Sequence, residues 1–165
     1  RYRNDYRSKQ NDHIIQEGIF MWGFIVALIS GALMSIQGVF NTEVTKQSST
    51  WTTSTFVQAT GFLACLIVWF VTEREQSFTM LLKVSPKYLL LGGIIGAAIT
   101  FTVIKSVASL GPAQSAMLIV ASQSVVSYLI EVFGLFGVEK TGFAWIKLLG
   151  VVLFVAGLLI FKWKS

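Results

Sequence analysis

Charged residues are scarce in this 165-residue chain: Asp, Glu, Lys and Arg make up 13% of it, against about a quarter in an average soluble domain. Cysteine and histidine occur once each, as Cys65 and His13, so the chain can form no intrachain disulfide and no zinc site of its own. Ser122 and Ser127 have no base near them in the sequence, so no nucleophile–base pair is visible. We therefore predict no catalytic residue, no metal and no cofactor, and an enzyme is the least expected class.

Apolar residues fill the chain instead, at 54%, and they gather in five stretches of about twenty. A helix needs about 20 apolar residues to cross the hydrocarbon core of a bilayer. We therefore predict an all-α polytopic membrane protein with spans at about residues 20–40, 52–71, 88–108, 113–133 and 143–161. Every tryptophan lies at an end of a predicted span, at the headgroup level that indole prefers: Trp22, Trp51, Trp69, Trp145 and Trp163.

Residues 1–20 form a polar segment without the pattern of a secretory signal. The stretch Gln16–Met21 can be encoded by DNA that contains AGGAGG, a ribosome-binding sequence, a few nucleotides before an ATG codon. We therefore expect translation to start at Met21, with residues 1–20 as upstream, non-native sequence and residues 21–165 as a five-helix transmembrane domain. The alternative is a genuine cytoplasmic tail.

The basic residues flank the spans and form no patch, so we expect the lipid bilayer, and no nucleic acid, as their partner. With five spans, nine of them fall on one side of the membrane and four on the other. Without residues 1–20 the numbers become five and four, which is almost no bias. A chain of this kind can insert in both orientations, and two opposite copies would form an antiparallel dimer equivalent to the inverted repeats of larger transporters.

Polar side chains recur along one face of several predicted spans. Gln37 and Asn41 share a face of the first span, and Gln123 and Ser127 share a face of the fourth. The amides of Gln37, Asn41 and Gln123 either converge on one cavity or bond neighbouring helices. For Gln58, in the second span, a bond to a neighbouring helix is the favoured interpretation.

Two charged residues lie near span ends, Lys105 in the third span and Glu131 in the fourth. Each is a functional candidate if it is buried, but each could also reach the interface by extending along its helix. The order of the spans places them near opposite sides of the membrane, so we expect no pair between them within one copy. Four glycines are predicted to let helices approach closely: Gly92, Gly96, Gly150 and Gly157.

Three segments resemble the YdcZ-like family of the drug/metabolite transporter superfamily. They are GALMSIQGVFNTEV (Gly31–Val44), LGPAQSAMLIVASQSVVSYLIEVFGLFGVEK (Leu110–Lys140) and the less specific LLGVVLFVAGLLIF (Leu148–Phe161). The positions that match are Gln37, Asn41, Gly111, Gln123, Glu131 and the segment Phe133–Gly137. The family commonly has Asp followed by His at the acidic position, whereas this chain has Glu131 followed by Val132.

The resemblance implies a small multi-pass protein of the bacterial inner membrane that pairs as antiparallel copies of itself or with a homologue. It also implies an exporter, so the leading hypothesis is a secondary transporter of a small organic solute with alternating access between two copies. Gln37, Asn41 and Gln123 would line the cavity, and Glu131 would supply a charge or a proton site near one mouth. Two alternatives remain open, a proton-coupled extruder of organic cations and a non-transporting subunit that stabilises or regulates a partner membrane protein.

Overall fold

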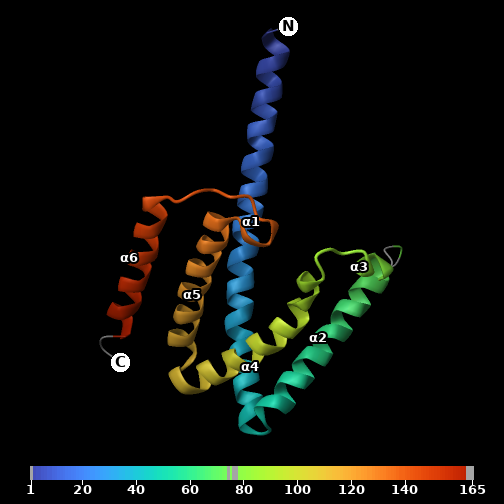
Figure 1. Cartoon of the computed structure of the whole chain (residues 1–165), viewed down its shortest axis with the longest axis vertical. Helices are drawn as coiled ribbons and strands as arrows, with labels where there is room; N and C mark the ends of the chain where they lie inside the picture. Colours follow the sequence, from blue (N-terminus) through green and yellow to red (C-terminus); the bar gives the residue numbers. More distant parts are fainter. Residues whose placement is uncertain (1, 74, 76–77, 163–165) are drawn as a thin grey trace. The chain divides into compact units, whose positions relative to one another are not determined.

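The computed structural model describes residues 2–73, 75 and 78–162, and in these residues it contains helices and no strand (Figure 1). Trp163, one of the predicted interface tryptophans, lies outside the described residues. The elements in chain order are α1 (Tyr2–Lys46), α2 (Thr50–Thr72), α3 (Thr79–Leu82), η1 (Lys87–Leu91), α4 (Gly92–Leu110), α5 (Pro112–Phe133), η2 (Leu135–Gly137) and α6 (Trp145–Lys162).

Four helical segments are long and apolar enough to cross a membrane. They are Gln16–Lys46 of α1, Thr50–Thr72, the combined η1 and α4 segment Lys87–Leu110, and Pro112–Phe133. The fifth apolar helix, α6, is shorter at 18 residues. At 1.5 Å per residue its length is about 27 Å, close to the hydrocarbon thickness of about 30 Å. The predicted all-α membrane fold is confirmed.

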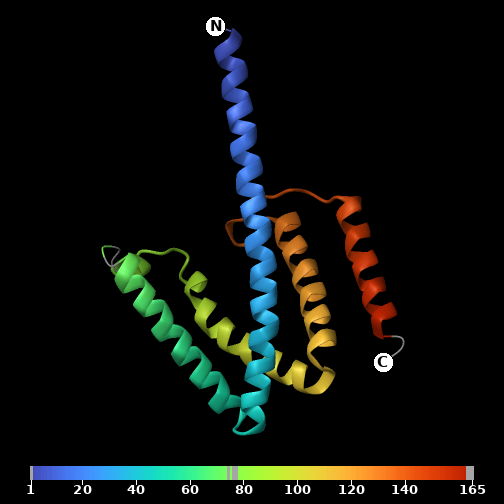
Figure 2. The same ribbon diagram turned by 180° about the vertical axis from the view of Figure 1, so that it is seen from behind.

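The chain divides into two compact units, Arg1–Gln37 and Gly38–Ser165, and the boundary lies within α1. Inside the second unit, α4 packs against both α2 and α5, and α5 packs against α6. The four helices therefore lie in the order α2, α4, α5, α6, as both views show (Figures 1 and 2). Because the four helices lie in a single row, most apolar side chains of the unit remain exposed within one copy.

The helix ends of this unit follow from local chemistry. Ser49 has extended backbone, and its hydroxyl accepts a hydrogen bond from the Thr52 N–H, which would otherwise have no partner at the start of α2. Gly111 has φ +79° and is followed by Pro112, whose missing N–H is not needed in the first turn of α5. Gly134 ends α5 in the left-handed region, at φ +66°. These residues set the two sharp turns between α4, α5 and η2.

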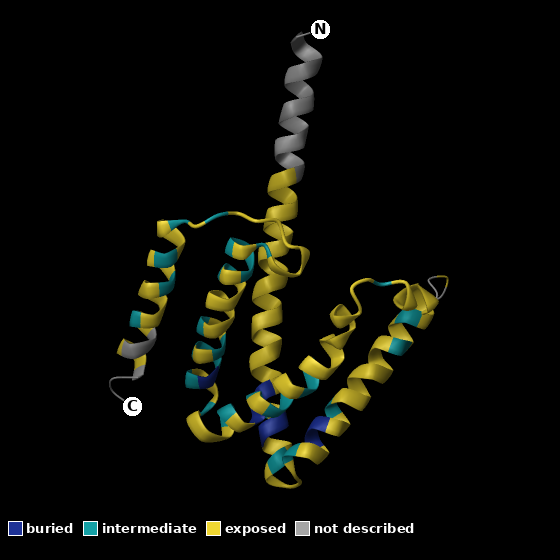
Figure 3. Cartoon of the chain, viewed as in Figure 1, coloured by how far each residue is buried: buried dark blue, intermediate teal, exposed yellow. Residues whose placement is uncertain are grey.

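Burial in the described residues is concentrated at one end of the second unit (Figure 3). This end contains the α1–α2 loop and the α4–α5 turn, and we call it the hydroxyl end. Ile104 lies at this end, and it is the one residue of the described chain whose apolar side chain is buried. The other buried residues with functional side chains are polar: Asn41, Thr42, Thr53, Ser54 and Ser115. The opposite end, which holds the α5–α6 loop at residues 134–144, is called the ion-pair end.

Candidate functional site

Side-chain hydroxyls join the helices at the hydroxyl end. The Thr45 hydroxyl donates to Thr53 Oγ1 at 3.0 Å, and the hydroxyls of Ser48 and Thr53 share a hydrogen bond of 2.9 Å. On the other side, the Ser106 hydroxyl donates to Ser115 Oγ at 3.1 Å and connects α4 to α5. Hydroxyl bonds of this kind hold helices together where no hydrophobic force acts between them.

Two buried polar groups at this end have no partner. Ser54 is 3% exposed and its hydroxyl oxygen makes no hydrogen bond with the described residues. Asn41, a predicted cavity residue, is 8% exposed, and none of the hydrogen bonds found among the described residues involves its amide. An unsatisfied buried polar group costs about 1–3 kcal/mol, so the Ser54 hydroxyl is a place where water or a polar solute would be held favourably.

Gly38 is a packing residue that the sequence analysis did not single out. A Cβ at this position would lie 3.3 Å from Cγ1 of Val103 and 3.6 Å from Cγ2 of Val107. The end of α1 therefore approaches α4 closely enough that only glycine fits without a shift. The Gly38 carbonyl also accepts the hydroxyl of Thr42 at 2.8 Å.

Gln58 contacts a neighbouring helix, as its favoured interpretation proposed. Its amide nitrogen lies 3.4 Å from Oγ1 of Thr100, at the long end of the hydrogen-bond range. A Cβ at Gly96 would lie 3.7 Å from the same nitrogen. The residue is nevertheless exposed within one copy, so this single weak bond leaves most of the amide without a protein partner.

The other predicted cavity residues are exposed. Gln37 is the last residue of the first unit. Gln123 and Ser127 lie on α5, and neither side chain makes a hydrogen bond with a described residue. The structure therefore does not bring Gln123 together with Asn41 by a hydrogen bond in one copy. The convergence of the three amides on one cavity stays a prediction.

Lys105 is exposed near the end of α4, at the hydroxyl end. Its ammonium lies 5.8 Å from the centre of the Phe101 ring, and that ring stacks on Trp51 with centroids 4.6 Å apart. No carboxylate of a described residue pairs with it. The contacts fit a lysine that extends along aromatic surface toward the headgroups.

Glu131 forms an ion pair at the ion-pair end. Its Oε2 lies 2.8 Å from Nζ of Lys147, the third residue of α6. The side chains of Glu131 and Lys147 are 41% and 48% exposed within one copy. Lys105 is not its partner, in agreement with the order of the spans. Sequence reasoning missed the pair, although the two charges lie at adjacent ends of consecutive spans, which was a usable signal.

At the same end, the Tyr128 side chain connects α5 to the start of α6. Its hydroxyl accepts the Ala144 N–H at 2.8 Å and donates to the Ala144 carbonyl at 3.1 Å. The Thr141 N–H donates to the Glu131 carbonyl at 3.1 Å. One side chain on α5 thus satisfies both backbone groups of the residue that precedes α6.

We predict that Tyr128→Phe lowers the free energy of unfolding by about 1–3 kcal/mol, because two hydrogen bonds are lost and the Ala144 N–H is left without a partner, whereas the Ala144 carbonyl keeps the N–H groups of Lys147 and Leu148. Thermal unfolding in detergent would measure the change. Tyr88→Phe is the matched control, since the Tyr88 hydroxyl makes no hydrogen bond with a described residue and its ring still faces Phe136 at 6.2 Å. Equal stabilities of the two variants would contradict the prediction.

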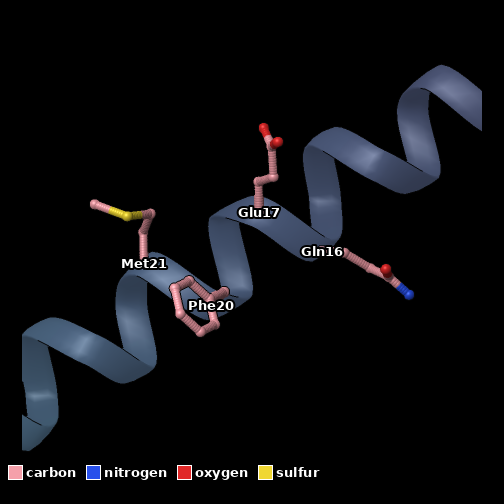
Figure 4. Close-up of a pocket in the computed structure, with 4 residues that line it drawn as sticks. All are labelled: Gln16, Glu17, Phe20 and Met21. Atoms are coloured by element: carbon pink, nitrogen blue, oxygen red, sulfur yellow. The ribbon is translucent and has the colours of Figure 1, made fainter. Parts of the chain in front are cut away.

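Other features do not form a site within one copy. A Cβ at three of the predicted packing glycines, Gly92, Gly150 and Gly157, would meet no described atom within 4 Å, so their role in packing stays a prediction for contacts with another chain. A shallow hollow on α1 is lined by residues 16, 17, 20 and 21, whose side chains all project from that one helix (Figure 4). No group of metal-ligating side chains occurs among the described residues.

Comparison with known proteins adds one finding. The sequence model of a family described as "Putative inner membrane exporter, YdcZ" matches residues 22–160. The matched region begins at Trp22 within α1 and ends at Ile160 within α6. It therefore contains both the hydroxyl end and the ion-pair end. No curated protein and no solved structure shows significant similarity to the chain.

Proposed function

The chain belongs to the YdcZ family of inner-membrane exporters, as its sequence resemblance predicted, and from this premise we propose a mechanism of export. The protein would be a multi-pass component of the bacterial inner membrane that exports a small organic solute by secondary-active transport. Two copies in opposite orientations, or one copy and a homologue, would enclose the transport path and expose it alternately to each side.

The exposed amides of the membrane-spanning helices support this proposal most strongly. Gln58 and Gln123 lie inside segments that are apolar enough to cross the bilayer, yet both are exposed within one copy. An amide that faces hydrocarbon without a hydrogen-bond partner costs about 2–7 kcal/mol. The Gln123 amide has no partner among the described residues, and the Gln58 amide has one long bond to Thr100. A second copy that covers these positions, with water or solute between the two, removes this cost.

The near-balance of basic residues supports opposite orientations for the two copies. If translation starts at Met21, five basic residues flank one side and four the other, which gives the insertion machinery little preference. Opposite copies would reproduce the inverted repeats on which many secondary transporters are built. The unoccupied faces at Gly92, Gly150 and Gly157 would then be available for contact with the second copy.

Each candidate residue has a role in this proposal. The unpaired amide of Asn41, together with Gln37 and Gln123, would hydrogen-bond the solute. Glu131, whose side chain is partly exposed within one copy, would supply a negative charge at one mouth of the path.

A non-transporting subunit is the second candidate, because exposed helix faces also suit a permanent partner. The two functions differ in whether water reaches Gln123.

We expect Gln123→Cys, in a Cys65→Ser background, to react with a membrane-impermeant maleimide in vesicles, and Val125→Cys to react at least about tenfold more slowly. Both positions are exposed within one copy and lie about 200° apart around α5, so the pair compares a path-facing with a lipid-facing site. Equal, slow labelling of both would favour the subunit.

A further inference from the structure

The Lys147 ammonium sits between two groups that together recognise organic cations. It lies 2.8 Å from the Glu131 carboxylate and 5.7 Å from the centre of the Tyr128 ring. A carboxylate gives charge, and the face of an aromatic ring attracts cations within about 6 Å of its centre. Lys147 reaches both groups from a different helix, at the end of a flexible four-carbon stem.

The surroundings fix the Tyr128 ring better than they fix Lys147. The Tyr128 hydroxyl is held by both backbone groups of Ala144, which sets the position of its ring. Phe143 continues the aromatic surface, with its ring 6.1 Å from Tyr128 and 5.0 Å from Trp145. The Glu131 carboxylate belongs to α5, like Tyr128, whereas the Lys147 side chain comes from α6, is 48% exposed and has Glu131 as the single hydrogen-bond partner of its ammonium in the described chain.

We propose that Glu131 and Tyr128 form a binding site for the ammonium group of an exported organic amine, and that Lys147 occupies this site as a tethered competitor when no amine is bound. The inference rests on the proposed function and names its substrate class. An arriving amine would take the place of the Lys147 ammonium on the carboxylate and ring, and Lys147 would turn outward to the headgroups. The charge at the mouth would be neutral before the exchange, and the displaced ammonium would then be solvated by water or lipid phosphate.

The arrangement selects by charge. The Glu131 carboxylate would repel an anionic solute. A neutral solute has no charge with which to replace the Lys147 ammonium on the carboxylate. A tethered group competes as if it were present at about millimolar concentration or above, so wild-type affinity for a simple amine should be weak. Removal of Lys147 removes the competitor and leaves the carboxylate and the ring in place.

The test uses n-butylammonium, which has the four carbons and the ammonium of a lysine side chain, and full-length protein in nanodiscs of phosphatidylcholine. Isothermal titration calorimetry should show that Lys147→Ala binds n-butylammonium at least about tenfold more tightly than wild type. The gain should disappear in Glu131→Gln/Lys147→Ala, and n-butanol, the neutral analogue, should show no gain in any variant. Should the alanine variant fail to fold, Lys147→Met keeps the stem and removes the charge, and a gain of the same sign is expected.

Unchanged affinity in a folded Lys147 variant, or an equal gain in the double variant, would overturn the inference and leave the ion pair as a structural clamp. This failure is separable from failure of the proposed function. Reactive Gln123→Cys together with unchanged amine affinity would contradict the ammonium site alone. Slow labelling of Gln123→Cys would contradict the proposed transport path itself.

Discussion

Gly38→Leu is expected to lower the free energy of unfolding by about 1–3 kcal/mol, because it forces a side chain into a contact that leaves no room for one. A Cβ alone would lie 3.3 Å from Val103 and 3.6 Å from Val107. Leucine adds three more carbons beyond that Cβ, and the valines are β-branched and stiff, so α1 and α4 must separate. Separation would also strain the hydroxyl bonds that Thr45 and Thr53 make nearby.

Thermal unfolding of purified protein would measure this effect. Gly93→Leu is the matched control, because Gly93 lies on α4 and a Cβ there would meet no described atom within 4 Å. Gly38→Ala should be close to neutral, since a shift of a few tenths of an ångström is offset by the helix propensity that alanine gains over glycine, about 1 kcal/mol. Equal stability of the two leucine variants would show that α1 and α4 do not approach each other as described.

The positions of the helices could be predicted well from the sequence. The predicted span at residues 52–71 differs from α2, Thr50–Thr72, by two residues at one end and one at the other. The predicted span at 113–133 likewise begins one residue after Pro112 and ends with α5 at Phe133. The reason is physical: hydrocarbon selects long apolar segments, and aromatic or polar residues mark their ends. Hydropathy does not report helicity of polar sequence, so the continuation of α1 back to Tyr2 was not predicted.

The candidate site could be predicted only in part. Asn41 was singled out for its residue type, and the structure places it among the buried polar residues at the hydroxyl end. The importance of Gly38 depends on which turn of α1 crosses α4, and a single sequence does not specify that crossing. The partner of Glu131 depends on the path of the α5–α6 loop, 134–144, whose glycines and Phe136 have positive φ angles. The charge pattern placed both residues of the ion pair at the same side of the membrane, but the pairing itself is set by the path of this loop, which periodicity does not predict.

The antiparallel pairing of two copies is the central claim of this account, and cross-linking tests it most directly. Ser48, in the α1–α2 loop, and Thr141, in the α5–α6 loop, are both exposed and lie at opposite ends of the second unit (Figures 1 and 2). Two differently tagged copies, Ser48→Cys and Thr141→Cys in a Cys65→Ser background, would be expressed together and treated with a bis-maleimide. Antiparallel copies bring the hydroxyl end of one beside the ion-pair end of the other.

We predict that the main product joins the two tags through positions 48 and 141, with at least about tenfold less product between two Ser48→Cys copies. The expectation follows from symmetry, because a two-fold axis in the membrane plane exchanges the two ends of the unit. A main product that joins position 48 to position 48 would mean parallel copies and would contradict the account. Absence of any product between the two copies would likewise contradict a homodimer.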